Sequence, residues 1–249
     1  MIYEIKTILE LIPHLDDDCW LFLDLDNTII ESVNEFGSDA WEKSLIQQHL
    51  AMGVSEEIAH QRSSLIWSAM QTVSPVRLVQ QEIRELFDFI HKKNIPYKFL
   101  TARSKAIINT TERQLDFIGI HQSFSEPEDL LFEENKCVVC KGKVIYCSDT
   151  SKGSVLQQFF KIKGIIPNKV IFVDDCISHL LNAQSVLESI NSFVGLRYGY
   201  LDEKMKSYQP DTITEIINQV FLNVEAAELM LKGLLLPLHC DAKKRRSGE

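Results

Sequence analysis

Short apolar runs alternate with longer amphipathic stretches along most of this chain. The runs at residues 20–24, 97–101 and 169–175 each end in polar side chains, which is the pattern of buried strands in a parallel sheet. Residues 192–198 form a further candidate strand. The stretches between the strands repeat their apolar positions every three or four residues, so they predict helices. This alternation predicts an α/β fold built on a doubly wound parallel sheet.

Two consecutive helices are predicted with no strand between them. Gly53 closes the first helix, and Ser55 opens the second with acidic residues in its first turn. They predict a small helical cap insert at residues 31–74, whereas residues 1–30 and 75–249 would form the core domain. Helices are predicted over residues 6–15, 38–52, 104–117 and 151–160, and from Pro75 to Asn94.

The composition favours a globular fold and argues against general nucleic-acid binding. The 249 residues are 45% hydrophobic, which is enough to bury a full core. Acidic residues number 35 and basic residues 26, and the net charge of -9 would repel a polyanion. The basic run from Lys243 to Arg246 is expected to be a solvated end.

The sequence predicts neither a leader nor a membrane span. The first residues carry no basic segment followed by a long apolar run, so no signal peptide is predicted. The most apolar window, residues 229–238, contains Lys232 and Pro237 and suits a buried helix better than a bilayer. We therefore expect a cytoplasmic protein. The sequence predicts no oligomeric state.

Six cysteines are present, and a chain of this size needs no disulfides to hold its core. Cys137, Cys140 and Cys147 are close enough in sequence to be considered as zinc ligands. However, residues 140–144 have the pattern of a hairpin turn, and strand residues three apart point to opposite faces. No histidine lies between Cys137 and Cys147 to complete a tetrahedral site. We predict reduced cysteines and no zinc.

The strongest chemical signal is the segment Asp24-Leu25-Asp26-Asn27-Thr28 at the end of the first predicted strand. Side chains alternate along a strand, so Asp24 and Asp26 can point the same way. Neighbouring carboxylates repel each other unless a cation or a proton lies between them. Mg²⁺ is the simplest candidate, because it takes oxygen ligands and keeps waters that a phosphate can displace.

Three further polar elements follow in order, namely Thr101, Lys152 and the pair Asp174-Asp175. Polar ends of parallel strands meet at one edge of a sheet. Each element also has a structural alternative, because Thr101 or Asp174 can cap a helix and Lys152 can be solvated. Arg103 could assist phosphate binding or form a surface salt bridge.

With these four elements in this order, the chain resembles the haloacid dehalogenase-like superfamily over about residues 20–175. The resemblance implies a Rossmann-like core and a magnesium-dependent phosphohydrolase that forms an aspartyl-phosphate. Asp24 would be the nucleophile, and Asp26 the general acid and later the base. Members that cleave carbon–halogen bonds lack the second aspartate, so Asp26 argues for a phosphatase or a phosphomutase.

The resemblance also implies which residues bind substrate and metal. Thr101 and Lys152 would bind the phosphate of a small phosphorylated substrate. Asp175 would reach the ion through water or orient its ligands. The ligands of Mg²⁺ would be Asp24, Asp26 through its backbone carbonyl, and Asp174. A phosphomutase, a protein or nucleotide phosphatase, and an inactive binding module with the same fold stay open as alternatives.

Overall fold

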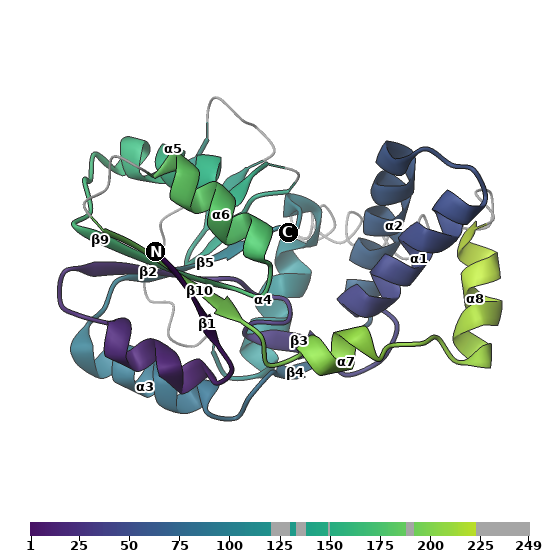
Figure 1. Ribbon diagram of the computed structural model, residues 1–249, viewed down its shortest axis with the longest axis horizontal. Coiled ribbons are helices and arrows are strands. Elements are labelled where there is room, and N and C mark those ends of the chain that lie inside the picture. Colours follow the sequence, from purple (N-terminus) through teal and green to yellow (C-terminus); the bar gives the residue numbers. More distant parts are fainter. Residues whose placement is uncertain (121–129, 133–137, 149, 188–191, 223–249) are drawn as a thin grey trace, which may run out of the picture. The chain divides into compact units, whose positions relative to one another are not determined.

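The computed structural model describes residues 1–120, 130–132, 138–148, 150–187 and 192–222 (Figure 1). These residues form two compact units. The first, here called the core unit, comprises Met1–Glu31 and Val76–Lys206. The second, here called the helical unit, comprises Ser32–Pro75 and the described residues from Ser207 onward.

The core unit contains a sheet of eight strands in the order β1-β10-β9-β2-β5-β8-β7-β6. Neighbouring strands from β1 to β8 are parallel, whereas β7 is antiparallel to both of its neighbours. Leu21 in the middle of the sheet lies opposite Tyr97 on one side and Ile171 on the other. The strands are β1 (Ile2–Ile5), β2 (Cys19–Leu23), β5 (Tyr97–Thr101), β6 (Leu130–Leu131), β7 (Val139–Lys141), β8 (Val144–Tyr146), β9 (Lys169–Asp174) and β10 (Ser192–Tyr198).

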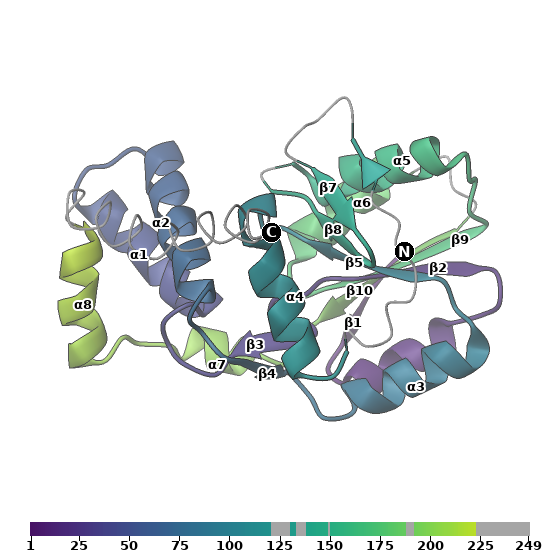
Figure 2. The same ribbon diagram turned by 180° about the vertical axis from the view of Figure 1, so that it is seen from behind.

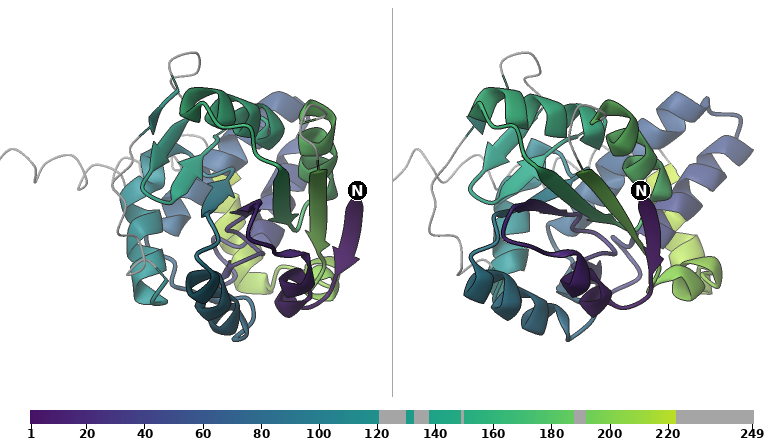
Figure 3. Two further views of the ribbon diagram at one scale, coloured as in Figure 1. Left: turned by 90° about the vertical axis from the view of Figure 1, so that its left-hand side faces the viewer. Right: turned by 60° about the vertical axis from the view of Figure 1, so that its left-hand side comes forward.

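Helices cover both faces of this sheet, as the two views in Figure 3 show. Leu21 and Leu23 of β2 lie in a buried cluster with residues of η1, α3 and α4. Phe22 points to the other face and lies in a second cluster with residues of α5 and α6. The helices of the core unit are η1 (Ile8–His14), α3 (Ile83–Lys93), η2 (Lys105–Ile107), α4 (Ile108–Phe117), α5 (Lys152–Lys163), α6 (Ile177–Val186) and α7 (Asp202–Lys206).

The winding of the chain reverses at β2. The connections from β2 to β5 and from β5 to β8 pass through α3 and α4 on one face. The connections from β8 to β9 and from β9 to β10 pass through α5 and α6 on the other face. The carboxyl ends of β2 and β9 therefore lie side by side at the topological switch point, where open α/β sheets bind ligands. The predicted doubly wound parallel sheet is confirmed.

The segment after Pro75 differs from its prediction. Residues Val76–Leu78 form strand β4, which pairs with β3 (Ile30–Ser32) in a separate two-stranded sheet, and helix α3 begins only at Ile83. Val76 and Leu78 are buried and the residue between them is exposed, which is the period of a strand. The apolar positions from Val76 onward match a helical period as well. The sequence alone therefore did not show that a strand precedes the helix.

Strand β1 has no counterpart in the sequence analysis. Among the described strands, it lies at the edge of the sheet and pairs with β10. Only Ile5 is fully buried among its four residues, so the strand carries no alternating apolar pattern. Its position is set by pairing with residues 193 positions later in the sequence, from Ile2 opposite Gly195 to Ile5 opposite Tyr198.

The helical unit contains α1 (Asp39–Ala51), α2 (Glu56–Gln71) and α8 (Thr212–Leu222). Trp41 is fully buried among apolar side chains of all three helices. Its indole Nε1 donates to Asn218 Oδ1 at 2.8 Å, which ties α1 to α8. The prediction placed residues 75–249 in the core domain, whereas α8 packs with α1 and α2 in the helical unit.

A buried histidine links α1 and α2 within the helical unit. The Nδ1 atom of His49 lies 3.0 Å from the carbonyl oxygen of Leu45 and 3.2 Å from Ser63 Oγ. Burial lowers the pKa of His49 below its ordinary value, and the hydrogen bond to Leu45 only partly opposes this. The folded protein therefore keeps His49 neutral at a pH where the unfolded chain is already protonated.

We predict that His49 makes the protein less stable as the pH falls. The stabilisation is complete above the unfolded pKa of about 6.5 and is lost below it, with a slope of at most about 1.4 kcal/mol per pH unit. Urea unfolding at pH 7 and pH 5 should show a smaller loss in His49→Gln than in the wild type. His60→Gln, at an exposed position of α2, is the control and should behave like the wild type. Equal losses in all three proteins would contradict the prediction.

Candidate active site

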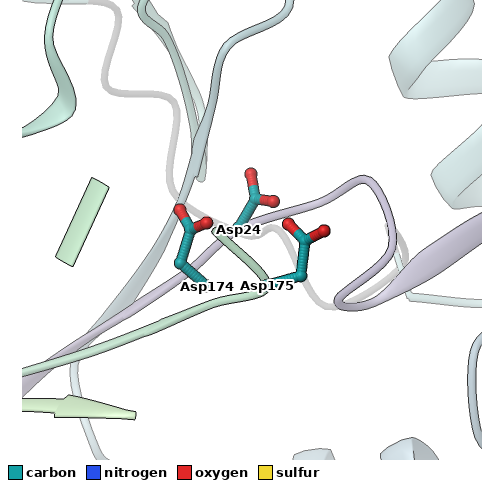
Figure 4. A group of neighbouring side chains, drawn as sticks. All are labelled: Asp24, Asp174 and Asp175. Atoms are coloured by element: carbon teal, nitrogen blue, oxygen red, sulfur yellow. The ribbon is translucent and has the colours of Figure 1, made fainter. Parts of the chain in front are cut away.

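Three carboxylates meet at the switch point of the sheet. Asp24 follows β2 directly, Asp174 is the last residue of β9, and Asp175 comes next. One oxygen of each lies within 4.8 Å of the others, and Figure 4 shows the three carboxyl groups around the same space. Asp24 and Asp174 are buried, while Asp175 is partly exposed. Such a group of oxygen ligands fits a divalent cation.

Lys152 lies between two of these carboxylates. Its Nζ atom is 2.6 Å from Asp24 Oδ1 and 2.7 Å from Asp174 Oδ2, and the side chain is buried. Lys152 is the first residue of α5, where the helix dipole disfavours a positive charge. The two carboxylates compensate for this and hold the ammonium group in place. The alternative of a solvated Lys152 is therefore wrong.

The pKa values of the cluster follow from its burial and its charges. Burial raises the pKa of Asp24 well above its ordinary value, Lys152 opposes this rise, and Asp174 and Asp175 add to it. Burial acts in the same direction on Asp174, but Lys152 and His179 outweigh it, so the pKa of Asp174 is lowered. The pKa of Lys152 is raised, because the two carboxylates outweigh burial. One lysine thus does not supply all the positive charge that these carboxylates need.

The residue after Lys152 allows α5 to approach α6 closely. A Cβ atom on Gly153 would lie 2.8 Å from the Cα atom of Ala183 and 2.9 Å from the carbonyl oxygen of Asn182. The backbone N–H of Gly153 donates to Asn182 Oδ1 at 3.1 Å. A side chain at this position would push the start of α5 outward and move Lys152 with it.

The second aspartate of the motif points to a different partner. The chain turns after Leu25, whose carbonyl accepts the N–H groups of Ile29 and Ile30 at 2.9 Å, and Asn27 takes a left-handed conformation with φ 57°. Asp26 forms two hydrogen bonds of 2.8 Å with the guanidinium of Arg103. Its carboxylate is not part of the acidic group around Lys152. The backbone carbonyl of Asp26 as a metal ligand stays a prediction.

Thr101 is the buried last residue of β5, the strand next to β2. Its Oγ1 accepts the backbone N–H of Arg103 at 3.2 Å. The helical segment that follows is capped by Ser104, whose Oγ accepts the N–H of Ala106 at 3.3 Å. The capping alternative for Thr101 is therefore wrong, and phosphate binding stays a prediction.

Asp174 has two further contacts, one of which the sequence analysis missed. Its Oδ1 accepts the backbone N–H of Cys176 at 2.8 Å, so Asp174 also supports the start of α6. His179 Nδ1, in the first turn of α6, lies 3.1 Å from both oxygens of Asp174. The only signal in the sequence was a histidine five residues after a strand-ending aspartate, which many helices share.

The geometry defines a doubly wound α/β protein with a carboxylate cluster and a buried lysine at its switch point. The chain belongs to the family described as "Protein of unknown function (DUF2608)", whose model matches residues 2–228. The family description names no activity, so it adds nothing to the chemistry of the site.

Curated relatives come from Chlamydia. A protein of Chlamydia trachomatis is 26% identical over 241 residues, which cover 94% of this chain and 91% of the relative. A protein of Chlamydia muridarum is 24% identical over 240 residues, with the same coverage of 94% and 91%. Both carry the name "Putative outer membrane protein".

Two solved structures are similar in part. A haloacid dehalogenase-like family hydrolase from Streptococcus pneumoniae is 15% identical, with a TM-score of 0.45, over 82% of this chain and 99% of that one. A protein of Thermotoga maritima described as "putative beta-phosphoglucomutase" is 13% identical, with a TM-score of 0.42, over 84% of this chain and 98% of that one.

The predicted cytoplasmic location is contradicted by the names of the chlamydial relatives. That prediction relied on the lack of a recognisable leader and of a long apolar run, and neither feature determines where a protein resides. Within the described part of the chain, no helix is both long enough and apolar enough to cross a membrane.

We predict that Asp175, rather than the side chain of Asp26, contributes to cation binding. At a concentration 100 times the Kd, Mg²⁺ should raise the free energy of unfolding of the wild type by about 2.7 kcal/mol. Thermal melts with and without Mg²⁺ should show a smaller rise for Asp175→Asn and an unchanged rise for Asp26→Asn. Asp88→Asn, which removes an exposed charge from α3, is the control. The reverse order of the two variants would refute the assignment.

The prediction of no zinc stays untested, because Cys137 lies outside the described residues. Cys140 and Cys147 are buried in the apolar cluster beneath α5 and α6. Metal analysis should find no tightly bound zinc in the purified protein, and Cys137→Ser should not change this result. One tightly bound zinc per chain, absent from that variant, would overturn the prediction.

Proposed function

We propose that this protein is a magnesium-dependent phosphohydrolase that forms an aspartyl-phosphate on Asp24. The observation that supports this most directly is the position of Lys152 Nζ, 2.6 Å from Asp24 and 2.7 Å from Asp174. An anionic nucleophile can approach an anionic phosphate only where positive charge compensates both. A buried ammonium group beside the nucleophile meets that need.

The carboxylates of Asp24, Asp174 and Asp175 would hold Mg²⁺. Their oxygens lie within 4.8 Å of one another, and hard oxygen ligands are what this ion prefers. Bound there, Mg²⁺ would offset negative charge on the phosphoryl group during transfer. His179 would keep the Asp174 carboxylate oriented through its contacts with both oxygens.

In the first half of the reaction, an oxygen of Asp24 would form a bond to phosphorus while the bond to the leaving oxygen breaks. Asp26 would give a proton to that leaving oxygen. In the second half, Asp26 would take a proton from water as the water oxygen bonds to phosphorus and the bond to Asp24 breaks. The hydroxyl group of Thr101, at the end of the neighbouring strand, would donate a hydrogen bond to a phosphoryl oxygen.

We also propose a small phosphorylated metabolite as the substrate, selected by the inserted helices acting as a cap. The support is their place in the chain, between the segment of Asp24 and that of Thr101. A cap at this position would exclude bulk water during the reaction.

The proposal predicts different defects for the two aspartates of the motif. The wild type should hydrolyse p-nitrophenyl phosphate only with Mg²⁺. Asp24→Asn should reduce activity to background with no labelled phosphoenzyme, because the nucleophile is gone. Asp26→Asn should still be phosphorylated by this activated substrate, and its phosphoenzyme should decay about 10²- to 10⁴-fold more slowly. Rapid-quench labelling measures both.

Three outcomes would count against the proposal. Phosphate trapped on Asp24→Asn would exclude Asp24 as the nucleophile. A phosphoenzyme that a sugar phosphate discharges much faster than water would indicate a phosphomutase. No magnesium-dependent activity in the wild type would favour a binding module. A thermal melt of Asp26→Asn is needed as a control, because this variant breaks the ion pair between Asp26 and the buried Arg103.

A further inference from the structure

Arg103 makes a two-point contact with Asp26. The guanidinium Nε donates to Asp26 Oδ2 and Nη2 donates to Asp26 Oδ1, each at 2.8 Å. This is the paired geometry in which an arginine fixes both the position and the plane of a carboxylate. The two residues lie 77 positions apart in sequence, at the ends of the neighbouring strands β2 and β5.

The other side of the guanidinium is held by helix α4. Nη1 donates to Thr111 Oγ1 at 3.0 Å and to Gln114 Oε1 at 2.6 Å, and both of these side chains are buried. The Thr111 hydroxyl donates in turn to the carbonyl oxygen of Ile107 at 3.0 Å. Because its own proton is used there, Thr111 is fixed as an acceptor toward Arg103.

Exposure differs sharply between the two partners. The Arg103 side chain has 0% of its surface exposed, whereas the Asp26 side chain keeps 19%. With its guanidinium fully buried, the contact of Arg103 with Asp26 is not the surface salt bridge that the sequence allowed. Each carboxylate oxygen has two lone pairs, and Arg103 occupies one on each. Asp26 therefore keeps lone pairs for a proton.

We infer that Arg103 is a positioning residue that holds Asp26 in the orientation its proton transfers require. The inference rests on the proposed function, in which Asp26 is the acid and base. Arg103 contacts the Asp26 carboxylate and affects the proton transfers by holding that carboxylate in place. Thr111 and Gln114 extend the support, because they determine where the guanidinium lies.

A purely structural role for the ion pair predicts a different result. If Arg103 only connected the turn after β2 to α4, its loss would lower kcat/KM for all substrates by the same factor. If it positions Asp26, its loss should matter most where leaving-group protonation limits the rate. p-Nitrophenyl phosphate has a leaving group that needs little protonation, whereas phenyl phosphate has one that needs more.

The test compares kcat/KM of Arg103→Met on these two substrates. Activity on p-nitrophenyl phosphate should change by less than about threefold, while activity on phenyl phosphate should fall about 10²-fold, within the usual contribution of a general acid. The phosphoenzyme should accumulate, because the base is also displaced. Arg103→Lys keeps the positive charge but not the bidentate geometry of the guanidinium, so its loss of activity on phenyl phosphate should be intermediate. Arg77→Met, which removes a 2.8 Å contact to Glu31 in the same unit, should leave the ratio unchanged.

Equal losses on both substrates, without phosphoenzyme accumulation, would overturn the inference. Should Arg103→Met fail to fold, Gln114→Met decides the matter, because it removes one support of the guanidinium and keeps the ion pair. It should shift the substrate ratio in the same direction by a smaller factor, and an unchanged ratio would refute the inference. A wild type that hydrolyses neither substrate would refute the proposed function instead.

Discussion

Three carboxylates lie within 4.8 Å of one another at the ends of β2 and β9, and such a group needs compensating positive charge to stay together. Lys152 supplies part of it, which requires α5 to begin beside those strand ends. Gly153 makes that start possible, since a side chain there would collide with α6. The strand ends, the start of α5 and the packing of α5 on α6 are thus set by one electrostatic requirement.

Much of the fold was predictable because local patterns carried it. The strand from Tyr97 to Thr101 has the predicted bounds, and Asn94 ends the preceding helix in a left-handed conformation with φ 53°. The failures were of a different kind. Strand β1 and helix α8 depend on partners far away in the sequence, β10 and the inserted helices. The local spacing of apolar residues does not encode such distant partners. From Val76 onward, the apolar positions fitted the period of a strand and that of a helix equally well.

The candidate site divides in the same way. The order of the motifs predicted Asp24, Lys152 and Asp174 as site residues, and the structure places these three side chains in contact. The carboxylate group also contains Asp175, whereas the side chain of Asp26 turns to Arg103. Neither composition nor spacing predicts a bidentate pair between residues 77 positions apart. From the sequence alone, Arg103 is an ordinary basic residue beside a motif. The structure supplied the partner and the burial that the sequence could not.

The unequal burial of Asp26 and Arg103 has a consequence for how the family can change over time. Losing Asp26 first would remove the carboxylate that forms an ion pair with a fully buried guanidinium. Removing one member of a buried ion pair costs about 3–5 kcal/mol, a large part of the stability of a typical domain. Losing Arg103 first would leave a carboxylate that is 19% exposed and can be hydrated. The two positions should therefore covary among homologues. A lineage that gives up the pair should pass through ancestors that retained the aspartate after the arginine had gone.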